Sequence, residues 1–241
     1  MIVYGKNAVR EALSGDDVIE KVLIEKGNFD KALNDIVKLA KERRAVLQFV
    51  DKGALTQKAG TSNHQGAVLI KGEFDYCSLD DILELARSKG ERALVVICDS
   101  ICDPHNLGAI LRSAECFGAH GVVISKHRSC PVNGTVIKAS AGAAEHILVA
   151  KVTNVNDAIR ELKERSVWVY ATDFDGDDIS KCDLTGDVAI VIGNEGDGIK
   201  RLTKELCDAT VTIKQYGKVN SLNASVACGV ALYEITRQRN K

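Results

Sequence analysis

The chain of 241 residues contains little that is typical of a secreted or membrane protein. It has no long apolar run, and residues 1–6 lead directly into domain-like sequence without a signal segment. Its eight cysteines show no paired spacing, which argues against a disulfide framework. We therefore expect a cytoplasmic protein without membrane contact, in which most cysteines are small core residues.

A metal site is also not expected. Cys98, Cys102 and His105 follow the spacing Cys-x3-Cys-x2-His, but no second pair of ligands accompanies them. Cys98 belongs to an apolar stretch that favours a buried strand.

Charge of one sign is not in excess either. The formal net charge is −1, and residues 1–75 hold 12 Lys and Arg against 11 Asp and Glu, while residues 76–241 hold 20 against 22. Binding to a nucleic acid must therefore come from local patches. The candidates are residues 41–44, 126–128 and 237–241, although such clusters are more often solvated surface.

The pattern of apolar residues predicts two α/β domains. Residues 1–72 alternate short helices and strands, and residues 73–90 hold a polar turn and a short amphipathic helix that favour a linker. Residues 91–241 show buried strands separated by helices, which is typical of a mostly parallel sheet covered on both faces. We expect these strands at 93–98, 121–125, 147–152, 167–172, 188–192 and 209–213.

The loop after the first of these strands carries polar side chains at the start of a helix. Asn106 is placed as the N-cap, and Arg112 and Glu115 can pair at i and i+3 away from the buried stripe. Such a pair is a weak surface ion pair if it lies in open solvent. If it lies beside a cleft, the carboxylate orients the guanidinium toward a ligand.

A second loop follows the strand at 188–192. Gly193, Gly196 and Gly198 surround the acidic residues Glu195 and Asp197, so backbone amides can approach a ligand closely. The spacing matches neither the P-loop nor the dinucleotide-binding pattern. The carboxylates suit a neutral or cationic ligand better than a phosphate, and the alternative is a tight acidic turn.

A third loop follows the strand at 209–213, and the next helix opens with Ser221, Asn223 and Ser225. These polar groups either receive a ligand or form an N-cap with spare hydroxyls. Ligands of parallel sheets bind beyond the carboxyl ends of the strands, so all three loops are expected at the same edge.

Together the three loops resemble the motifs of SpoU-type RNA 2′-O-ribose methyltransferases of the SPOUT superfamily. The matching segments are Asn106-Leu107-Gly108-x3-Arg112-x2-Glu115, Gly193-Asn194-Glu195-Gly196-x-Gly198-Ile199 and Ser221-Leu222-Asn223-Ala224-Ser225-Val226-Ala227. Residues 138–143 resemble a further family element. Residues 4–9 and 64–68 resemble the small substrate-binding domain, similar to ribosomal protein L30e, that precedes the catalytic domain in the branch acting on 23S rRNA.

The resemblance implies a deep trefoil knot in the C-terminal domain, S-adenosylmethionine as cofactor and a homodimer. It assigns the cofactor pocket to Ile192, Gly193, Asn194, Gly196, Ile213, Leu222 and Ser225. The last helix would contribute to the dimer contact. One departure is that Lys214-Gln215 stand where the family usually has Pro-Met, and Lys214 could reach an RNA phosphate.

The resemblance further implies that Arg112, Asn106, Glu115, Glu195, Ser221 and Asn223 serve the reaction. A guanidinium stays protonated at neutral pH, so we expect Arg112 to orient the ribose hydroxyl and stabilise its developing charge, held by Glu115. The substrate is expected to be a guanosine in 23S rRNA. The alternatives are a guanosine in tRNA, or a non-catalytic RNA-binding or ribosome-assembly protein.

Overall fold

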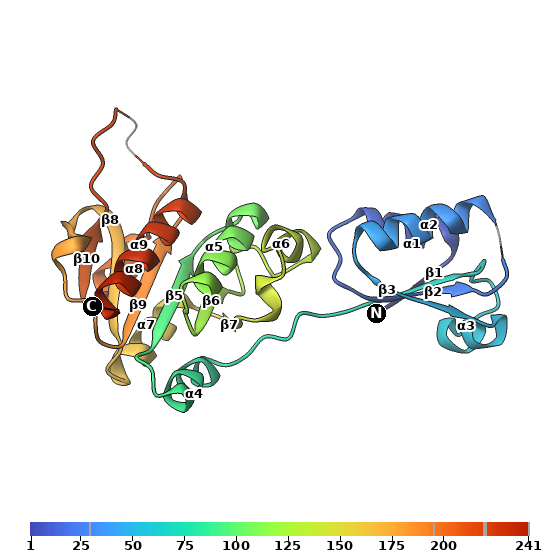
Figure 1. Ribbon diagram of the computed structural model, residues 1–241, viewed down its shortest axis with the longest axis horizontal. Helices are drawn as coiled ribbons and strands as arrows, with labels where there is room; N and C mark the ends of the chain where they lie inside the picture. Colours follow the sequence, from blue (N-terminus) through green and yellow to red (C-terminus); the bar gives the residue numbers. More distant parts are fainter. Residues whose placement is uncertain (29, 195, 219–220, 241) are drawn as a thin grey trace. The chain divides into compact units, whose positions relative to one another are not determined.

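The computed structural model describes residues 1–28, 30–194, 196–218 and 221–240. The chain divides into two compact units, Met1–Phe74 and Asp75–Lys241, which are described separately (Figure 1). No helix among the described residues is long and apolar enough to cross a membrane.

The first unit is a four-stranded sheet with helices on both faces. Its elements are β1 (Ile2–Tyr4), α1 (Lys6–Ser14), β2 (Ile19–Glu25), α2 (Lys31–Glu42), β3 (Val46–Val50), α3 (Lys52–Ala59) and β4 (Ala67–Lys71). The strand order is β1-β4-β2-β3, with β2 and β3 parallel and the other pairs antiparallel. The helices α1 and α2 pack on one face, whereas Leu55 of α3 packs on the other.

The two segments of this unit that resemble the L30e-like domain lie side by side. The Gly5 amide donates to Ala67 O over 3.1 Å, and the Lys6 amide donates to Gln65 Oε1 over 3.1 Å. Gly66 has a φ of +82°, a left-handed conformation that favours glycine at the start of β4.

The second unit contains a six-stranded sheet in which every pairing is parallel, as the sequence predicts. Its strands are β5 (Leu94–Asp99), β6 (Gly121–Ser125), β7 (Leu148–Val152), β8 (Trp168–Asp178), β9 (Val188–Gly193) and β10 (Ala209–Thr212). They are arranged in the order β10-β8-β9-β5-β6-β7.

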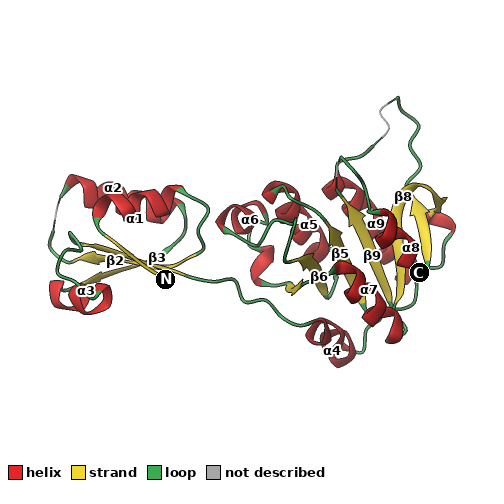
Figure 2. Cartoon of the chain, turned by 180° about the vertical axis from the view of Figure 1, so that it is seen from behind, coloured by secondary structure: helices red, strands yellow, loops and turns green. Residues whose placement is uncertain are grey.

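Helices cover both faces of this sheet (Figure 2). They are α4 (Leu79–Lys89), α5 (Pro104–Cys116), α6 (Gly134–Ala139), α7 (Val155–Glu164), α8 (Arg201–Leu206) and α9 (Ala224–Arg239). The apolar faces of α4 and α7 pack with alternate side chains of the strands, and α5 pairs with α9 on the opposite face. The trefoil knot that the resemblance implies stays a prediction.

The segment 73–90, which we expected to be a linker, contains α4. Leu79, Ile82 and Leu83 are buried in the core of the second unit, and the Cys77 amide donates to Val149 O over 3.0 Å. This helix is therefore part of the second unit's core.

The far end of α9 fastens the amino-terminal edge of the second sheet. The Arg239 guanidinium donates to Arg92 O and Ala93 O, each over 2.9 Å, and to Gly186 O over 2.6 Å. Because carbonyl oxygens accept all of these bonds, Arg239 holds the two chain segments that enter β5 and β9.

Candidate functional site

The three polar loops meet at the carboxyl edge of the second sheet. Because β9 lies between β8 and β5, and β10 lies beside β8, the segments that follow these strands are neighbours. The Asn194 side-chain amide, after β9, donates to Ser100 O, after β5, over 2.8 Å. The expectation that the loops share one edge is thus met by the fold.

The glycine-rich loop is a tight turn that closes on itself. Asn194 and Gly198 exchange backbone hydrogen bonds of 3.0 and 2.9 Å, and the Gly196 amide donates to Asn194 Oδ1 over 2.8 Å. A Cβ atom on Gly193 would lie 2.4 Å from the Gly198 carbonyl carbon, so only glycine fits there.

The third loop is joined to the first by a pair of asparagines. Asn223 Oδ1 accepts from the amides of Ser225 and Val226 at the start of α9, over 3.0 and 3.3 Å. Asn223 Nδ2 donates to Asn106 Oδ1 over 2.9 Å. Asn223 therefore caps α9 and also fixes the position of α9 relative to α5.

Asn106 does not have the place that the sequence analysis gave it. The N-cap of α5 is Asp103, whose Oδ1 accepts from the His105 amide over 2.9 Å, and Pro104 is the first helical residue. Proline is favoured at that position, so α5 starts earlier than predicted. This leaves Asn106 inside the first turn, buried and facing Asn223.

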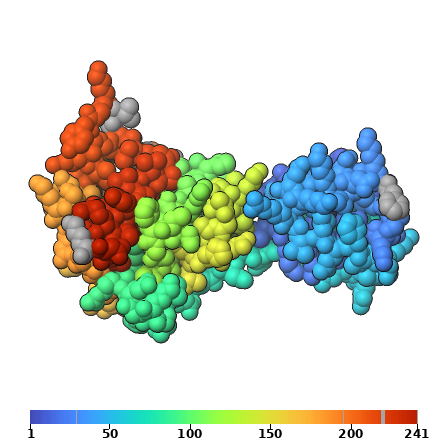
Figure 3. All heavy atoms as spheres, viewed as in Figure 1, coloured from blue at the N-terminus to red at the C-terminus, as the bar shows by residue number. Residues whose placement is uncertain are grey.

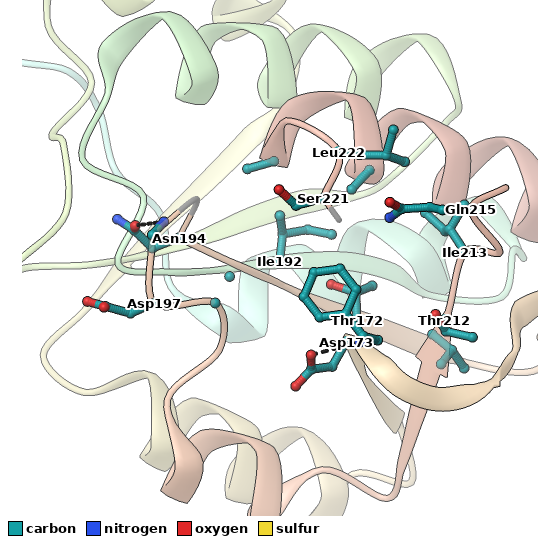
Figure 4. A pocket seen from close by; sticks show the side chains of 17 residues that line it. Thr172, Asp173, Ile192, Asn194, Asp197, Thr212, Ile213, Gln215, Ser221 and Leu222 are labelled. Carbon is teal, nitrogen blue, oxygen red and sulfur yellow. Dashed lines mark hydrogen bonds between the residues drawn. The ribbon is translucent and has the colours of Figure 1, made fainter. Parts of the chain in front are cut away.

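A cavity of about 350 Å³ lies among these loops (Figure 4). In the close view Ser221 and Leu222 lie on one side of it and Asp173 on the other. Its lining is formed by Thr172, Asp173, Phe174, Ile192, Gly193, Asn194, Gly196, Asp197, Gly198, Val211, Thr212, Ile213, Gln215, Ser221, Leu222, Ala224 and Ala227.

These lining residues include two carboxylates and neither lysine nor arginine. The volume is within the range of small-molecule sites, and the glycines expose backbone amides and carbonyls to the interior. The cavity therefore suits a ligand with hydrogen-bonding groups and a positive charge.

The chain matches two family models in succession. Residues 2–76 match the model for RNA 2′-O ribose methyltransferase substrate binding, and residues 93–233 match the model for the SpoU rRNA Methylase family. The chain is also 43% identical over 239 residues to YacO of Bacillus subtilis, whose name places it among TrmH family tRNA/rRNA methyltransferases. That alignment covers 99% of this chain and 96% of YacO.

The chain belongs to the SpoU methylase family.

Solved structures of SpoU proteins show the same fold. The methyltransferase AviRb from Streptomyces viridochromogenes, in complex with AdoMet, has a TM-score of 0.65 at 24% identity and covers 100% of this chain and 90% of its own. The A. aeolicus TrmH/SpoU tRNA modifying enzyme has a TM-score of 0.57 at 27% identity and covers 67% of this chain and 85% of its own. The expected α/β fold with a substrate-binding unit in front is confirmed.

SpoU methyltransferases use S-adenosylmethionine, so the cofactor expectation is confirmed at the level of the family. The cavity fits this group, because its lining includes Asp173 and Asp197 but neither lysine nor arginine, and its glycines allow close backbone contact with a cationic cofactor. When bound, the cofactor supplies an activated methyl group.

Most residues expected to bind the cofactor lie in the cavity wall of this SpoU protein. Ile192, Gly193, Asn194, Gly196, Ile213 and Leu222 line it, as does Ser221, which was expected to be catalytic. Ser225 does not line it, because its hydroxyl donates to Asn223 Oδ1 over 2.6 Å. Glu195 lies outside the described residues.

Arg112 and Glu115 are exposed on α5 and are not among the lining residues. No ion pair joins them in the part of the chain that the structure describes, so the expected pairing is not observed. The Arg112 guanidinium takes part in no ion pair with any other described residue either, and remains available to a ligand or partner.

Sequence reasoning missed the part of the cavity wall formed by Thr172, Asp173 and Phe174 in the middle of β8. Lys204 of α8 holds this segment through ion pairs with Asp173, over 2.6 Å, and with Asp175. These hydrogen bonds raise the pKa of Lys204 and lower that of Asp175. The only sequence signal was the run of acidic residues that follows the apolar part of β8.

Lys214 and Gln215, which stand where the family usually has Pro-Met, have different positions in the structure. Lys214 Nζ lies 3.1 Å from Asp178 Oδ2, whereas Gln215 lines the cavity. Hydrogen bonds from Ser180 and then from Lys214 lower the pKa of Asp178 to about 2. Lys214 therefore anchors the start of the loop to β8, and Gln215 offers an amide to the ligand.

Proposed function

We propose that this chain transfers a methyl group from S-adenosylmethionine to the ribose 2′-hydroxyl of a guanosine in 23S rRNA. The observation that carries the proposal is the hydrogen bond from Asn223 to Asn106, which joins the cavity loop to the helix of Arg112. The bond would thereby hold the cofactor cavity in a fixed relation to α5, the helix that we propose below as part of the interface across which the partner's Arg112 reaches this cavity.

Arg112 is proposed to bind and orient the ribose. The transfer breaks the sulfur–methyl bond, with S-adenosylhomocysteine as the leaving group, and forms a carbon–oxygen bond, while the hydroxyl proton passes to solvent water. A guanidinium presents a planar fork of donors that stabilises the charge developing on the oxygen. An Arg112→Lys variant keeps the charge without the fork, so we expect at least a tenfold loss in kcat with unchanged cofactor affinity. Near-full turnover of this variant would refute the role of planar geometry.

We further propose that the chain acts as a homodimer through α9 and α5. Val226, Val230 and Tyr233 form an apolar strip on α9, with 49%, 38% and 56% of each residue exposed. They border a groove of about 400 Å³ that also includes Phe117, which directly follows α5 and whose ring packs edge-on against Tyr233. Apolar strips of this kind are typical of homodimer contacts.

A second copy in this groove would bring another Arg112 close to the cavity. Ala109 and Ser113 of α5 line the groove on either side of Arg112 in sequence, and Ser225 links the groove to the Asn223 cap. Because Arg112 does not line the cavity of its own chain, we propose that it serves the cavity of the partner.

Mixed dimers of an Arg112→Ala chain and a Gly193→Ala chain test this arrangement. Gly193→Ala blocks the glycine turn, so each homodimer should be inactive. If Arg112 acts across the interface, the mixed dimer regains one complete site and roughly half the activity. If it acts within its own chain, the mixed dimer stays inactive.

The front unit supports rRNA as the substrate. The matching methylase model is that of an rRNA family, and a separate substrate-binding model covers residues 2–76. The A. aeolicus tRNA modifying enzyme, by contrast, covers only 67% of this chain. We propose the cytoplasm, where ribosomal RNA is made, as the place of action.

The proposed substrate is tested by transfer of tritiated methyl groups to 23S rRNA and to total tRNA, both lacking modifications. We expect label in 23S rRNA, recovered as 2′-O-methylguanosine after digestion. Label in tRNA alone would favour the tRNA alternative. Failure to bind S-adenosylmethionine in calorimetry would favour the non-catalytic protein.

A further inference from the structure

One segment of the second unit is nearly free of acidic residues. Residues 104–144 contain four lysines and arginines but only one carboxylate, Glu115, in a chain with 32 basic and 33 acidic residues. This segment builds α5, β6, the loop after β6, and α6. The balanced net charge of the chain therefore hides a local excess of positive charge.

Three of these cations form what we call the cationic surface: Lys126, Arg128 and Lys138. Lys126 and Arg128 lie in the loop after β6 and Lys138 lies on α6, and all three are exposed. None of them forms an ion pair with any residue that the structure describes. They are thus free to interact with an anion in solution.

Each of the other two basic clusters has at least one cation that is engaged inside the molecule. Arg43 donates to Gly15 O and to Asp17 O, the latter over 2.7 Å. Arg237 pairs with Glu234 over 2.7 Å, and Arg239 holds backbone carbonyls. Among the residues that the structure describes, the cationic surface differs from these clusters in that none of its three cations pairs with a carboxylate.

The cationic surface adjoins the loop that leads into α5. The Cys130 amide donates to Ile101 O over 2.8 Å, and Cys102 Sγ donates to Arg128 O over 3.4 Å. These contacts fasten the loop after β6 to the loop after β5. The backbone that carries Arg128 is thereby fixed beside the N-terminal end of α5.

The helix α6 connects the surface to Arg112. A Cβ atom on Gly108 of α5 would lie 2.5 Å from Ala139 Cβ, so the two helices meet there at close range. Arg112 lies one turn further along α5, on the same side as Gly108. Lys138 precedes Ala139 and therefore lies near the point where α6 meets the helix that carries Arg112.

We propose that the cationic surface binds the phosphates of the RNA strand flanking the nucleotide to be methylated. This inference rests on the proposed function, since it assumes that RNA reaches Arg112. Lysine and arginine contacts to phosphates carry little sequence information. The surface would thus hold the strand in register at the site, while the front unit selects the RNA by its shape.

The salt dependence of RNA binding tests the proposal. The surface variant carries Lys126→Gln, Arg128→Gln and Lys138→Gln. The affinity of this variant and of the wild type for unmodified 23S rRNA is measured at a series of salt concentrations. Each phosphate contact contributes about 0.7 to 0.9 to the slope of log K against log salt. We expect the slope to fall by about 2 and the affinity to drop roughly tenfold or more at 0.1 M salt.

A control variant removes the same charge on the opposite face of the sheet. It carries Arg87→Gln, Lys89→Gln and Arg160→Gln, on α4 and α7. We expect its salt slope to equal that of the wild type. Both variants should bind S-adenosylmethionine with wild-type affinity, which shows that the cavity is folded.

The outcomes separate this proposal from the proposed function. If the surface variant keeps the wild-type slope, or if the control variant loses as much, the cationic surface does not bind RNA phosphates. If the wild type binds RNA with the expected slope but methylates neither 23S rRNA nor tRNA, the proposed function fails while the binding surface stands. If the surface variant loses cofactor binding, single substitutions at Lys126 and Lys138 give the slope in folded protein.

Discussion

At the scale of single residues, Asn223 has two structural roles at the site. Its side-chain oxygen caps α9, and its side-chain nitrogen donates to Asn106. An asparagine can do both because its amide carries an acceptor and a donor. Aspartate could cap the helix but could not donate the second bond, so the cap and the cavity loop depend on the same amide group.

An Asn223→Ala variant is expected to lose stability and cofactor affinity together. Loss of an N-cap costs about 1 kcal/mol, and loss of the bond to Asn106 adds about another. We expect a decrease of about 2 kcal/mol in the free energy of unfolding in denaturant, with weaker binding of S-adenosylmethionine in calorimetry.

Asn154→Ala is the matched control, since Asn154 caps α7 away from the cavity and accepts from the Asn156 amide over 3.0 Å. It should lose about 1 kcal/mol with no change in cofactor affinity. Equal cofactor affinities in the two variants would show that Asn223 is only a cap.

Asp173 is expected to favour the cationic cofactor over its neutral product. Asp173 lines the cavity and Lys204 keeps its carboxylate in place. We expect Asp173→Asn to weaken binding of S-adenosylmethionine about three- to tenfold, and binding of S-adenosylhomocysteine, which lacks the sulfonium charge, much less. Asp175→Asn is the control, because Asp175 pairs with the same Lys204 but does not line the cavity. An equal loss for both ligands would contradict the electrostatic role.

Residues at the site were predicted where a motif marks them and missed where it does not. The glycine turn and Ser221 carry a signature within a few residues, so their place in the cavity wall follows from the sequence. Asp173 is held by Lys204 of α8, which is distant in the sequence and meets it only in the folded unit. The residues next to Asp173 in the sequence do not predict such a contact.

At the scale of secondary structure, long apolar strands were easier to predict than short helices. The strand β6 was predicted with the bounds it has, because Gly121–Ser125 is apolar and flanked by polar turns. The six-residue α6 was missed, since Gly134–Ala139 is too short to show a helical period. The start of α5 was placed late because Asp103 and Pro104 were taken as loop.

The start of β5 depends on a buried histidine with a defined protonation state. The Leu94 amide donates to His120 Nδ1 over 3.1 Å, and His120 Nε2 lies 3.0 Å from Glu91 Oε2. Burial lowers the pKa of His120 below 6.5, although Glu91 acts in the opposite direction. A proton on Nδ1 would remove the acceptor of the Leu94 amide.

Stability is therefore expected to fall in mild acid. On acidification His120 takes up a proton near pH 6.5 in the unfolded chain, but only at a lower pH in the folded chain. The contribution of neutral His120 to the free energy of unfolding is therefore fully present above pH 6.5 and is lost as the pH falls below it. We expect His120→Gln to reduce the slope of unfolding free energy between pH 7 and 5 by up to about 1.4 kcal/mol per pH unit. The same slope in the wild type and in the His120→Gln variant would contradict the role of His120.

At the scale of the whole molecule, the two units have separate hydrophobic cores. The sequence predicted this division from the change in pattern, from short mixed elements to long buried strands. It could not show that α4 belongs to the second core, because an amphipathic helix does not indicate which surface it covers.

The second unit alone, Asp75–Lys241, is expected to keep the cofactor site and lose the substrate. All residues that line the cavity lie in this unit, and so do Arg112 and Asn106. We expect wild-type affinity for S-adenosylmethionine in calorimetry and at least a tenfold loss of methyl transfer to 23S rRNA. Methyl transfer at the wild-type rate would show that the front unit is not needed for recognition.

The chain directly after β10 projects from the second unit (Figure 3), and α9 is the last helix of that unit. Cys228, Leu232 and Ile235 of α9 are fully buried, and Arg239 closes the far edge of the sheet. The ribosome must therefore release α9 before this core can be completed, whereas the first core is complete once β4 has emerged. Until then, nascent β5 and β9 expose apolar faces, and this is the interval in which a chaperone would be most useful.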